Sequence, residues 1–270
     1  MTIKLVAIDL DDTLLRDDFT ISPRTLAAVR AVRESGVKIT LATGRMPGSA
    51  RPYAEQLALD VPVINYHGAM IQHALSREII FRRVIPVNLA EELVGFLQKK
   101  QLYVQIYLRD QVFTRELNKY SDLYKRIAKV RIEQRDLLQL LQEEPEGVEK
   151  ILVINEEHAI SKLADILGQR YGRKIHLTKS KPIFLEFTEI TVNKGAALAS
   201  LAESYGFARE EVMAIGDSFN DLEMIEYAGL GVAMGNAGPE VRAKADVITG
   251  TNQEDGVAQA LERYVLNLSN

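Results

Sequence analysis

Apolar runs and helical periodicities alternate in the first part of the chain. Residues 4–10, 37–42 and 61–66 are short, largely apolar runs with β-branched side chains, which are typical of buried strands. Residues 23–35 and 48–57 lie between these runs and carry apolar side chains at helical spacing. Strands that alternate with helices favour a parallel sheet covered by helices on both faces. The pattern therefore predicts successive βαβ units and an α/β fold.

The same alternation returns in the last third of the chain, with short connections. The expected strands are 212–215, 231–234 and 246–248, and the expected helices are 194–205, 220–228, a segment near Glu240, and 255–266. The two ends of the chain together predict one Rossmann-like parallel-sheet core, formed by residues 1–83 and 188–270.

Residues 84–187 have a different pattern. Tyr103, Gln105 and Tyr107 occupy alternate positions of one run, and this period of two is typical of an antiparallel, half-exposed sheet. A Pro-Glu-Gly turn at 145–147 interrupts the region. We therefore predict a separate α+β domain that is inserted into the sheet core, so that the chain has two domains.

The composition narrows the classes of protein and partner. A chain of 270 residues with 47% apolar and 26% charged residues is typical of an ordinary globular protein. Its formal net charge of -4 provides no basic surface, so neither nucleic acid nor a membrane is expected as a partner. The absence of cysteine excludes disulfides, thiol catalysis and cysteine-based zinc sites. No apolar segment has the length of a signal sequence or a membrane span, so we expect a cytoplasmic protein.

Polar side chains follow several of the predicted strands. Asp9 and Asp11 end the first strand, and strand alternation places their carboxylates on the same side. Residues 43–45 (Thr-Gly-Arg) follow the second strand, and residues 216–221 (Gly-Asp-Ser-Phe-Asn-Asp) end a later one. The carboxyl ends of parallel strands share one edge of a sheet, so these residues are expected to converge there. Taken alone, the two acids could instead cap the following turn.

Several carboxylates at one edge require a cation. Two unit charges about 4 Å apart repel by roughly 4 kcal/mol at an effective dielectric constant near ~20, and a bound phosphate adds to this repulsion. Asp9, Asp217 and Asp221 supply oxygen ligands for a hard divalent cation, and an octahedral site completed by phosphate and water favours Mg²⁺. No His-x-x-x-His pair is present, so zinc is not expected.

Four motifs occur in order along the chain. They are 9–13 (Asp-Leu-Asp-Asp-Thr), 43–45 (Thr-Gly-Arg), 192–195 (Val-Asn-Lys-Gly) and 216–221, which Met224 follows. With these motifs the sequence resembles the haloacid dehalogenase superfamily, specifically its Cof-type sugar-phosphatase branch, over essentially the whole chain. The resemblance implies a Rossmann-like core and an inserted α/β cap at 84–187, which closes over the core and determines substrate specificity.

The resemblance also implies a Mg²⁺-dependent phosphatase that hydrolyses small phosphomonoesters through an aspartyl-phosphate. Asp9 would attack phosphorus, and Asp11 would protonate the leaving oxygen and then deprotonate the hydrolytic water. Thr43 and Lys194 would bind phosphoryl oxygens. The implied metal residues are the side chains of Asp9 and Asp217, the backbone carbonyl of Asp11, and Asp221 as a further ligand or as support for one.

Further contacts with the substrate, a small phosphorylated metabolite, follow from the resemblance. The implied core residues are Gly44, Arg45 and Asn220, and the polar candidates on the cap are Tyr107, Arg109, His176, Lys179 and Ser180. Each cap candidate could instead be exposed to solvent without a role. The links near Val84 and Phe187 are expected to act as hinges.

Some of these residues have structural alternatives. Lys194 could be a solvated surface lysine, although a lysine in the first turn of a helix is unfavourable to the helix dipole. Thr43 could be a helix N-cap. Asp12 stands where this branch commonly has glycine, and His67 stands where it commonly has asparagine. His67 could contact substrate or only support the turn.

Two other functions remain open at this point. Phosphomannomutases resemble this family and have its cap type, and such an enzyme would return the phosphoryl group to the bound sugar instead of to water. A non-catalytic sensor of phosphorylated metabolites would bind them in the same crevice, but the intact motifs disfavour it. The sequence predicts neither an oligomeric state nor a particular substrate.

Overall fold

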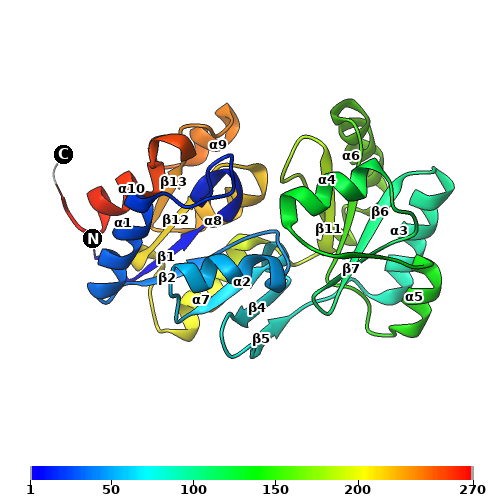
Figure 1. Cartoon of the computed structure of the whole chain (residues 1–270), viewed down its shortest axis with the longest axis horizontal. Coiled ribbons are helices and arrows are strands. Elements are labelled where there is room, and N and C mark those ends of the chain that lie inside the picture. The colour runs from blue at the N-terminus through cyan, green and yellow to red at the C-terminus, as the bar shows by residue number, and fades with distance from the viewer. Residues whose placement is uncertain (1, 269–270) are drawn as a thin grey trace.

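A parallel sheet of five strands forms the centre of one lobe, here called the core lobe, in the computed structural model, which describes residues 2–268 (Figure 1). In the order β14-β13-β12-β1-β2, these strands are Val247–Ile248, Leu230–Ala233, Val212–Gly216, Leu5–Ile8 and Lys38–Leu41. The strand β1 therefore lies between β2 and β12, which come from opposite ends of the chain, and both pairings are parallel. The arrangement confirms the predicted α/β fold.

Helices cover both faces of this sheet. They are α1 (Pro23–Glu34), α2 (Pro47–Gln56), α7 (Lys194–Ser204), α8 (Leu222–Tyr227), α9 (Pro239–Lys244) and α10 (Gly256–Tyr264), with short helical turns at Leu10–Leu14, Tyr66–Gly68, Arg209–Glu211, Phe219–Asp221 and Asn252–Glu254. In β1, Val6 and Ile8 pack with α1 and α10, whereas Leu5 and Ala7 pack with α7 and α8 on the other face. All four side chains are fully buried, as a continuous apolar run predicts.

An antiparallel sheet of three strands extends the core lobe. The strand β3 (Pro62–Asn65) continues beside β2 through a parallel bridge between Ala42 and Ile64, and it pairs with β4 (Met70–His73). The strand β4 pairs in turn with β5 (Ile79–Arg82). Ile79 and Ile80 are both half exposed, so the β4–β5 hairpin lacks the alternation that would predict it from sequence.

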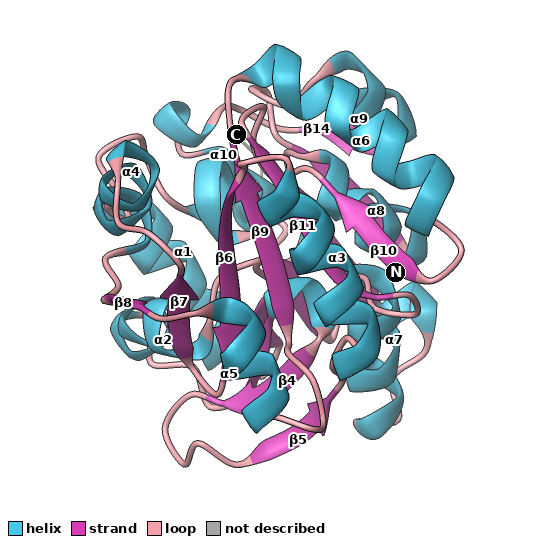
Figure 2. Ribbon diagram, turned by 90° about the vertical axis from the view of Figure 1, so that its right-hand side faces the viewer, coloured by secondary structure: helices cyan, strands magenta, loops and turns pink. Residues whose placement is uncertain are grey.

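A sheet of six strands forms the second lobe, here called the cap lobe. In the order β10-β11-β9-β6-β7-β8, the strands are Ile175–Thr178, Phe184–Glu189, Lys150–Ile154, Tyr103–Leu108, Gln111–Thr114 and Ile132–Gln134. All pairs are antiparallel except β7 with β8. The helices α3 (Val87–Lys99), α5 (Leu137–Glu143) and α6 (Glu157–Tyr171) cover one face, and α4 (Lys119–Ala128) lies on the other (Figure 2).

One face of the cap sheet is buried where the period of two predicts exposure. Tyr103, Gln105 and Tyr107 are at most 7% exposed, because α4 and core-lobe residues such as Tyr66 cover them. Their polar atoms satisfy one another: the Gln105 amide donates to the Tyr103 hydroxyl, and the Tyr107 hydroxyl donates to Gln105, both at 2.8 Å. The prediction of a half-exposed sheet is therefore wrong, since alternation distinguishes two faces but does not say which one meets water.

We propose that the two lobes are the domains expected at 1–83 with 188–270 and at 84–187. Each lobe has an apolar cluster of its own, and a further cluster joins cap residues to core-lobe residues such as Met46 and Met70. The chain passes between the lobes after β5 and again after β11 (Figure 1). The cap lobe is thus joined to the core lobe by two links and by a shared apolar contact region, to which polar contacts such as that of Lys150 with Gly44 are added.

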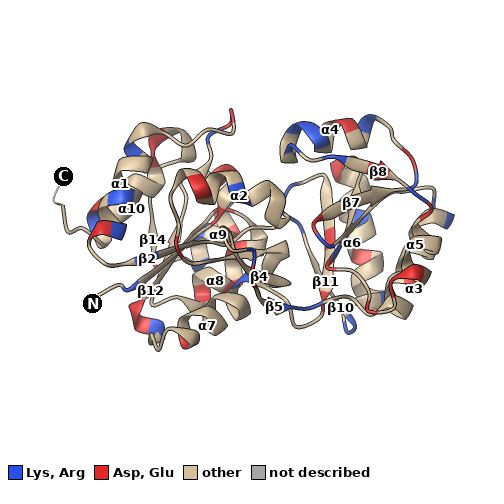
Figure 3. Ribbon diagram, turned by 60° about the horizontal axis from the view of Figure 1, so that its bottom comes forward, with Lys and Arg blue, Asp and Glu red and all other residues tan. Residues whose placement is uncertain are grey.

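Charged residues of both signs alternate along the outer helices, for example on α1, α10 and α4 (Figure 3), and some of them form ion pairs. This mixture agrees with the small formal net charge of -4. Within residues 2–268, no helix combines the length and the apolar character needed to cross a bilayer.

Gly147 occupies a position that excludes a side chain. Its φ is 109°, and an added Cβ would lie 1.9 Å from the carbonyl oxygen of Ile85. The substitution Gly147→Ala should therefore lower the free energy of unfolding by roughly 2–4 kcal/mol, because positive-φ strain adds to a backbone clash. Urea unfolding followed by circular dichroism measures the change. Gly206→Ala is the matched control, because Gly206 also has a positive φ but nothing lies within 4 Å of its added Cβ. Equal losses in the two variants would contradict the clash.

Candidate active site

Asp9 lies at the carboxyl end of β1, in the interior of the parallel sheet. Its backbone N–H still bonds the carbonyl of Ile215 in β12, at 2.9 Å, before the chain turns away through Leu10–Leu14. Within this turn Asp12 has a φ of 61°, a left-handed conformation that favours glycine and that aspartate tolerates better than most residues. The aspartate at this departure from the family pattern is therefore compatible with the turn.

The Lys194 side chain is fully buried between two carboxylates. Its ammonium donates to Asp9 Oδ1 at 2.5 Å and to Asp221 Oδ1 at 2.6 Å. Asn193 caps the helix α7, which Lys194 begins, by accepting from the N–H of Ala196 at 2.7 Å. Burial alone would lower the pKa of Lys194, but the charges of Asp221 and Asp9 outweigh it and raise that pKa above its ordinary value. Lys194 is thus a fixed ammonium within the site and not a solvated surface lysine.

Asp221 uses both of its carboxylate oxygens within the protein. Oδ1 accepts from Lys194, and Oδ2 accepts from the backbone N–H groups of Asp217 and Ser218, each at 3.0 Å. The carboxylate comes this close because position 216 is glycine: an added Cβ on Gly216 would lie 2.5 Å from the Cβ of Asp221. Asp221 therefore fixes both Lys194 and the loop that carries Asp217.

Three carboxylates form a cluster that fits a divalent cation. One oxygen from each of Asp9, Asp217 and Asp221 lies within 4.8 Å of the other two. The hydroxyls of Thr13 and Ser218 donate to Asp217 at 2.7 and 2.9 Å and orient it. Burial, followed by the charge of Asp221, raises the pKa of Asp217 to about 7 and raises the pKa of Asp9 well above its usual range. The single ammonium of Lys194 therefore does not balance the negative charge of the three carboxylates. The carboxylate oxygens are ligands that suit Mg²⁺.

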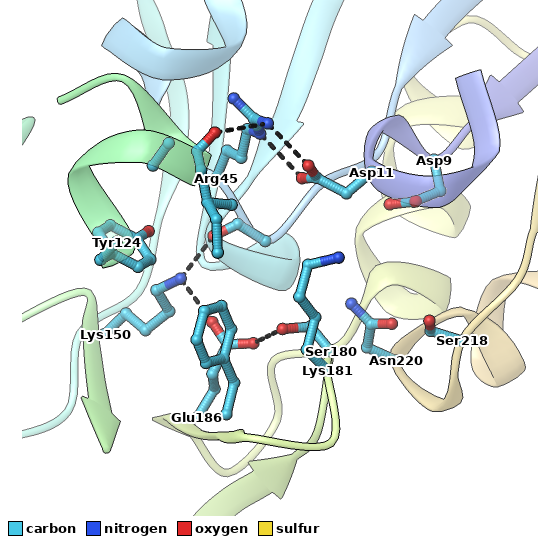
Figure 4. A pocket seen from close by; sticks show the side chains of 14 residues that line it. Asp9, Asp11, Arg45, Tyr124, Lys150, Ser180, Lys181, Glu186, Ser218 and Asn220 are labelled. Atoms are coloured by element: carbon cyan, nitrogen blue, oxygen red, sulfur yellow. Dashed lines mark hydrogen bonds and ion pairs between the residues drawn. The ribbon is translucent and has the colours of Figure 1, made fainter. Parts of the chain in front are cut away.

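Asp11 forms a bidentate ion pair with Arg45. The guanidinium donates from Nε at 2.8 Å and from Nη2 at 2.7 Å. Arg45 also donates to the hydroxyl of Ser49 at 3.1 Å and to the carbonyl of Ile127, in the cap lobe, at 3.3 Å. Burial would raise the pKa of Asp11, but the hydrogen bonds and charge of Arg45 outweigh burial and hold that pKa below its usual value. Asp11, Asp9 and Arg45 line one cavity (Figure 4).

Gly44 lies between a histidine ring and a lysine. Its carbonyl accepts from the ammonium of Lys150 at 2.6 Å, and an added Cβ would lie 2.2 Å from Cε1 of His67. The hydroxyl of Thr43 accepts from the backbone N–H of Arg45 at 3.1 Å and so closes the turn. Glycine is therefore the residue that fits between Thr43 and Arg45.

His67 is buried and connects the core lobe to the cap lobe. Its Nδ1 lies 3.1 Å from the amide nitrogen of Asn220, and its Nε2 lies 3.0 Å from the carboxylate of Glu186, in a polar contact that is not aligned as a hydrogen bond. Burial lowers the pKa of His67, so the ring is neutral at pH 7 and accepts from Asn220 at Nδ1. His67 is not among the residues that line the cavity, which favours a supporting role.

A cavity of about 50 Å³ lies between the two lobes. Its core-lobe wall consists of Asp9, Asp11, Gly44, Arg45, Ser218 and Asn220, and its cap-lobe wall includes Tyr124, Lys150, Ser180, Lys181 and Glu186. Figure 4 shows Lys150 and Glu186 across the cavity from Asp9. The structure thus brings several strand-end residues of the core lobe to one side of a space that polar cap residues close, whereas Thr43 and Lys194 lie outside this wall and Asp217 lines a neighbouring pocket.

Of the polar cap candidates, Ser180 lines this cavity. The others lie outside its wall: Tyr107 is buried among aromatic rings, Arg109 forms an ion pair at the surface, Lys179 covers the ring of another residue, and His176 is half-buried in β10.

Lys150, Glu186 and Lys181 line the cavity although the sequence did not single them out. Lys150 begins the apolar run of β9, and Glu186 interrupts that of β11. A charge inside a buried run is costly without a partner, and this was the signal that could have identified both residues. Lys181, which pairs with Asp12 of the core lobe, lies in a loop and carries no such signal.

Comparison with known proteins identifies the family. The family model for haloacid dehalogenase-like hydrolases matches residues 6–261. The chain is 34% identical to the 5-amino-6-(5-phospho-D-ribitylamino)uracil phosphatase YcsE of Bacillus subtilis, with 98% of this chain and 96% of that protein covered. It is 28% identical to the pyridoxal phosphate phosphatase YbhA of Escherichia coli, with 98% and 100% covered. The crystal structure of a haloacid dehalogenase-like hydrolase from Bacteroides thetaiotaomicron is similar with a TM-score of 0.86 at 33% identity, with 97% and 99% of the chains covered. The resemblance drawn from the four motifs is thereby confirmed, and the chain belongs to the haloacid dehalogenase-like hydrolases.

Proposed function

We propose that this hydrolase is a Mg²⁺-dependent phosphatase that acts on small phosphomonoesters, such as sugar phosphates, through an aspartyl-phosphate. The observation that carries the proposal is the Asp9 carboxylate, which lines the cavity between the lobes and is held by Lys194 through Oδ1 at 2.5 Å. Within the described residues, no group donates a hydrogen bond to its other oxygen, which is therefore available to attack. The relatives named as phosphatases of two different phosphate esters support this class of reaction.

In the first step, Asp9 would form a bond to phosphorus while the bond from phosphorus to the leaving alcohol breaks. Lys194 would stabilise the negative charge shared by Asp9 and the transferred group. Asp11 would give a proton to the leaving oxygen. Because the bidentate pair keeps Asp11 ionised, this role requires Arg45 to loosen its hold, and phosphoryl oxygens offer Arg45 an alternative partner.

In the second step, water would attack phosphorus in the aspartyl-phosphate, and the bond between Asp9 and phosphorus would break. The Asp11 carboxylate would accept a proton from this water, so that phosphate leaves and Asp9 is restored. The Thr43 hydroxyl can donate its proton to a phosphoryl oxygen while it accepts from the N–H of Arg45. Gly44 and Asn220, which both line the cavity, would contact the bound phosphoryl group.

The cation would be held by the side chains of Asp9 and Asp217 with the backbone carbonyl of Asp11. When bound, Mg²⁺ would neutralise the charge of the carboxylates and of the phosphoryl oxygens. For Asp221 we propose support of a ligand and not ligation, because Lys194 and two backbone N–H groups already engage both of its oxygens.

Asp9→Asn should reduce phosphate release by at least about 10³-fold, because an amide oxygen does not replace the nucleophile. A phosphate-release assay over a panel of sugar phosphates at several Mg²⁺ concentrations measures this loss, and thermal unfolding verifies that the variant is folded. Asp18→Asn is the matched control, because Asp18 is an exposed acid whose carboxylate accepts from the N–H and the hydroxyl of Thr20, and it should keep wild-type activity. Turnover retained in the Asp9 variant would exclude Asp9 as the nucleophile.

Asp11→Asn should slow both chemical steps by roughly 10²–10⁴-fold, because an amide does not transfer protons. With p-nitrophenyl phosphate, whose leaving group needs little protonation, the loss should fall mainly on the second step. Phosphorylated Asp9 should then accumulate, and mass spectrometry of acid-quenched samples detects it. Unchanged kinetics in this variant would refute the acid–base assignment.

Removal of divalent cations with EDTA should abolish phosphate release, and added Mg²⁺ should restore it. Asp217→Asn should raise the Mg²⁺ concentration needed for half-maximal activity by about tenfold or more, because it removes a charged ligand. Titration of activity against Mg²⁺ measures both effects. Full activity in EDTA would be incompatible with the proposed metal.

A further inference from the structure

Two opposite charges are buried in the face of the cap lobe that meets the core lobe. Lys150 is 1% exposed and Glu186 is 3% exposed, and they lie on the neighbouring strands β9 and β11. Leu152 and Phe184 belong to the apolar cluster on the same face. The Lys150 ammonium donates to Glu186 Oε1 at 2.6 Å. Charged groups are seldom buried this completely unless they are paired, and pairing alone rarely adds stability over apolar side chains. Their place in an apolar wall therefore needs a further reason.

The pair reaches the residues that surround the phosphoryl site. Lys150 donates to the carbonyl of Gly44 at 2.6 Å, and Glu186 Oε1 lies 3.0 Å from Nε2 of His67. The other oxygen of Glu186 accepts from the hydroxyl of Ser180. The ammonium of Lys150 and the carboxylate of Glu186 are thus already in contact with polar groups of the core lobe and with the Ser180 hydroxyl of the cap lobe.

The pair also lines the cavity on the side opposite Asp9 (Figure 4). A phosphoryl group that reacts with Asp9 in line must direct its leaving alcohol away from Asp9, toward this wall. The cavity of about 50 Å³ has room for only a few water molecules, and it shares Ser180, Lys181 and Ser218 with a neighbouring pocket of about 470 Å³. A leaving group that enters the cavity on the side of Lys150 therefore has to displace contacts such as the one between Lys150 and Gly44, and has to supply equivalent contacts itself.

We propose that Lys150 and Glu186 determine substrate specificity by binding the hydroxyl groups of a polyol or sugar leaving group, an inference that rests on the proposed phosphatase function. One hydroxyl can donate to the Glu186 carboxylate while it accepts from the Lys150 ammonium, which an alkyl chain cannot do. Asn220, also in the cavity wall, is 7% exposed, and its Oδ1 has no partner among the described residues, so it offers a further acceptor. A leaving group without hydroxyls would leave these buried polar atoms unpaired. Sites built to hydrogen-bond a hydroxyl strongly reject an analogue that lacks it.

A purely structural role predicts a different result. If the pair only fastened the cap lobe to Gly44 and His67, its removal would change the rates with all phosphate esters by a common factor. Recognition of hydroxyl groups instead changes the ratio between esters that differ in hydroxyls alone. The decisive quantity is therefore a ratio of kcat/KM values and not the activity with one substrate.

The test compares glycerol phosphate with propyl phosphate, and sorbitol phosphate with hexyl phosphate, at saturating Mg²⁺. Each pair has the same number of carbon atoms and differs in hydroxyl groups. The wild-type enzyme should prefer the polyol ester. The double variant Lys150→Met with Glu186→Gln removes both charges together, so no unpaired charge stays buried. Its polyol-to-alkyl ratio of kcat/KM should fall by about tenfold or more, the loss expected for one charged hydrogen bond. Glu186→Asp keeps Lys150 paired and provides a second variant, whose ratio should also fall.

The matched control is the double variant Arg82→Met with Glu149→Gln. Arg82 and Glu149 form another ion pair that involves a fully buried cap carboxylate, at 2.8 Å, but neither residue lines the cavity, so the ratio should stay at the wild-type value. A wild-type enzyme that shows no preference for the polyol, or a ratio unchanged in both variants at Lys150 and Glu186, overturns this inference and leaves the phosphatase function intact. A wild-type enzyme that releases no phosphate from any ester overturns the proposed function itself.

Discussion

The ammonium of Lys194, buried between Asp9 and Asp221, is the interaction on which the rest of the site depends. An ammonium without water is tolerated only where acceptors surround it, so the end of β1, the turn after β12 and the start of α7 must meet at one point. The same contact leaves the site with an excess of negative charge, because Asp217 also lies within this cluster. The fold therefore holds carboxylates in an environment that disfavours their charge, which is typical of functional sites.

The residues at the sheet edge could be predicted because strand ends place them there. Asp9 and residues 43–45 and 216–221 follow buried runs that the sequence makes plain, and parallel topology brings such ends together. The contribution of the cap lobe could not be predicted in the same way. Lys150 and Glu186 gain their role from the packing of one lobe on the other, and a pattern of alternate residues does not reveal which face of a sheet that packing will cover.

The buried charges that line the cavity between the lobes are compensated within each lobe. Lys150 and Glu186 both belong to the cap lobe, so their ion pair would stay intact if the lobes separated. Asp11 and Arg45 likewise form an ion pair within the core lobe. Their contacts across the boundary are with neutral groups, such as the carbonyl of Gly44. A hydrogen bond of this kind contributes roughly 1–3 kcal/mol, far less than the burial of an isolated charge would cost. Separation of the lobes at the cavity therefore exposes polar groups without leaving a buried charge alone.

Apart from those beside the two links, the ion pairs that join one lobe to the other are partly exposed. Lys181 and Asp12 are 24% and 44% exposed, and Arg51 and Asp110, at 3.6 Å, are 20% and 35% exposed. Ion pairs in contact with water contribute little to stability, because solvent replaces most of the interaction when they part. The many contacts between the lobes thus oppose opening much less than their number suggests. The cavity beside Lys150 holds only a few waters, so a substrate group that fills this side requires the lobes to part, and this distribution of charge allows it.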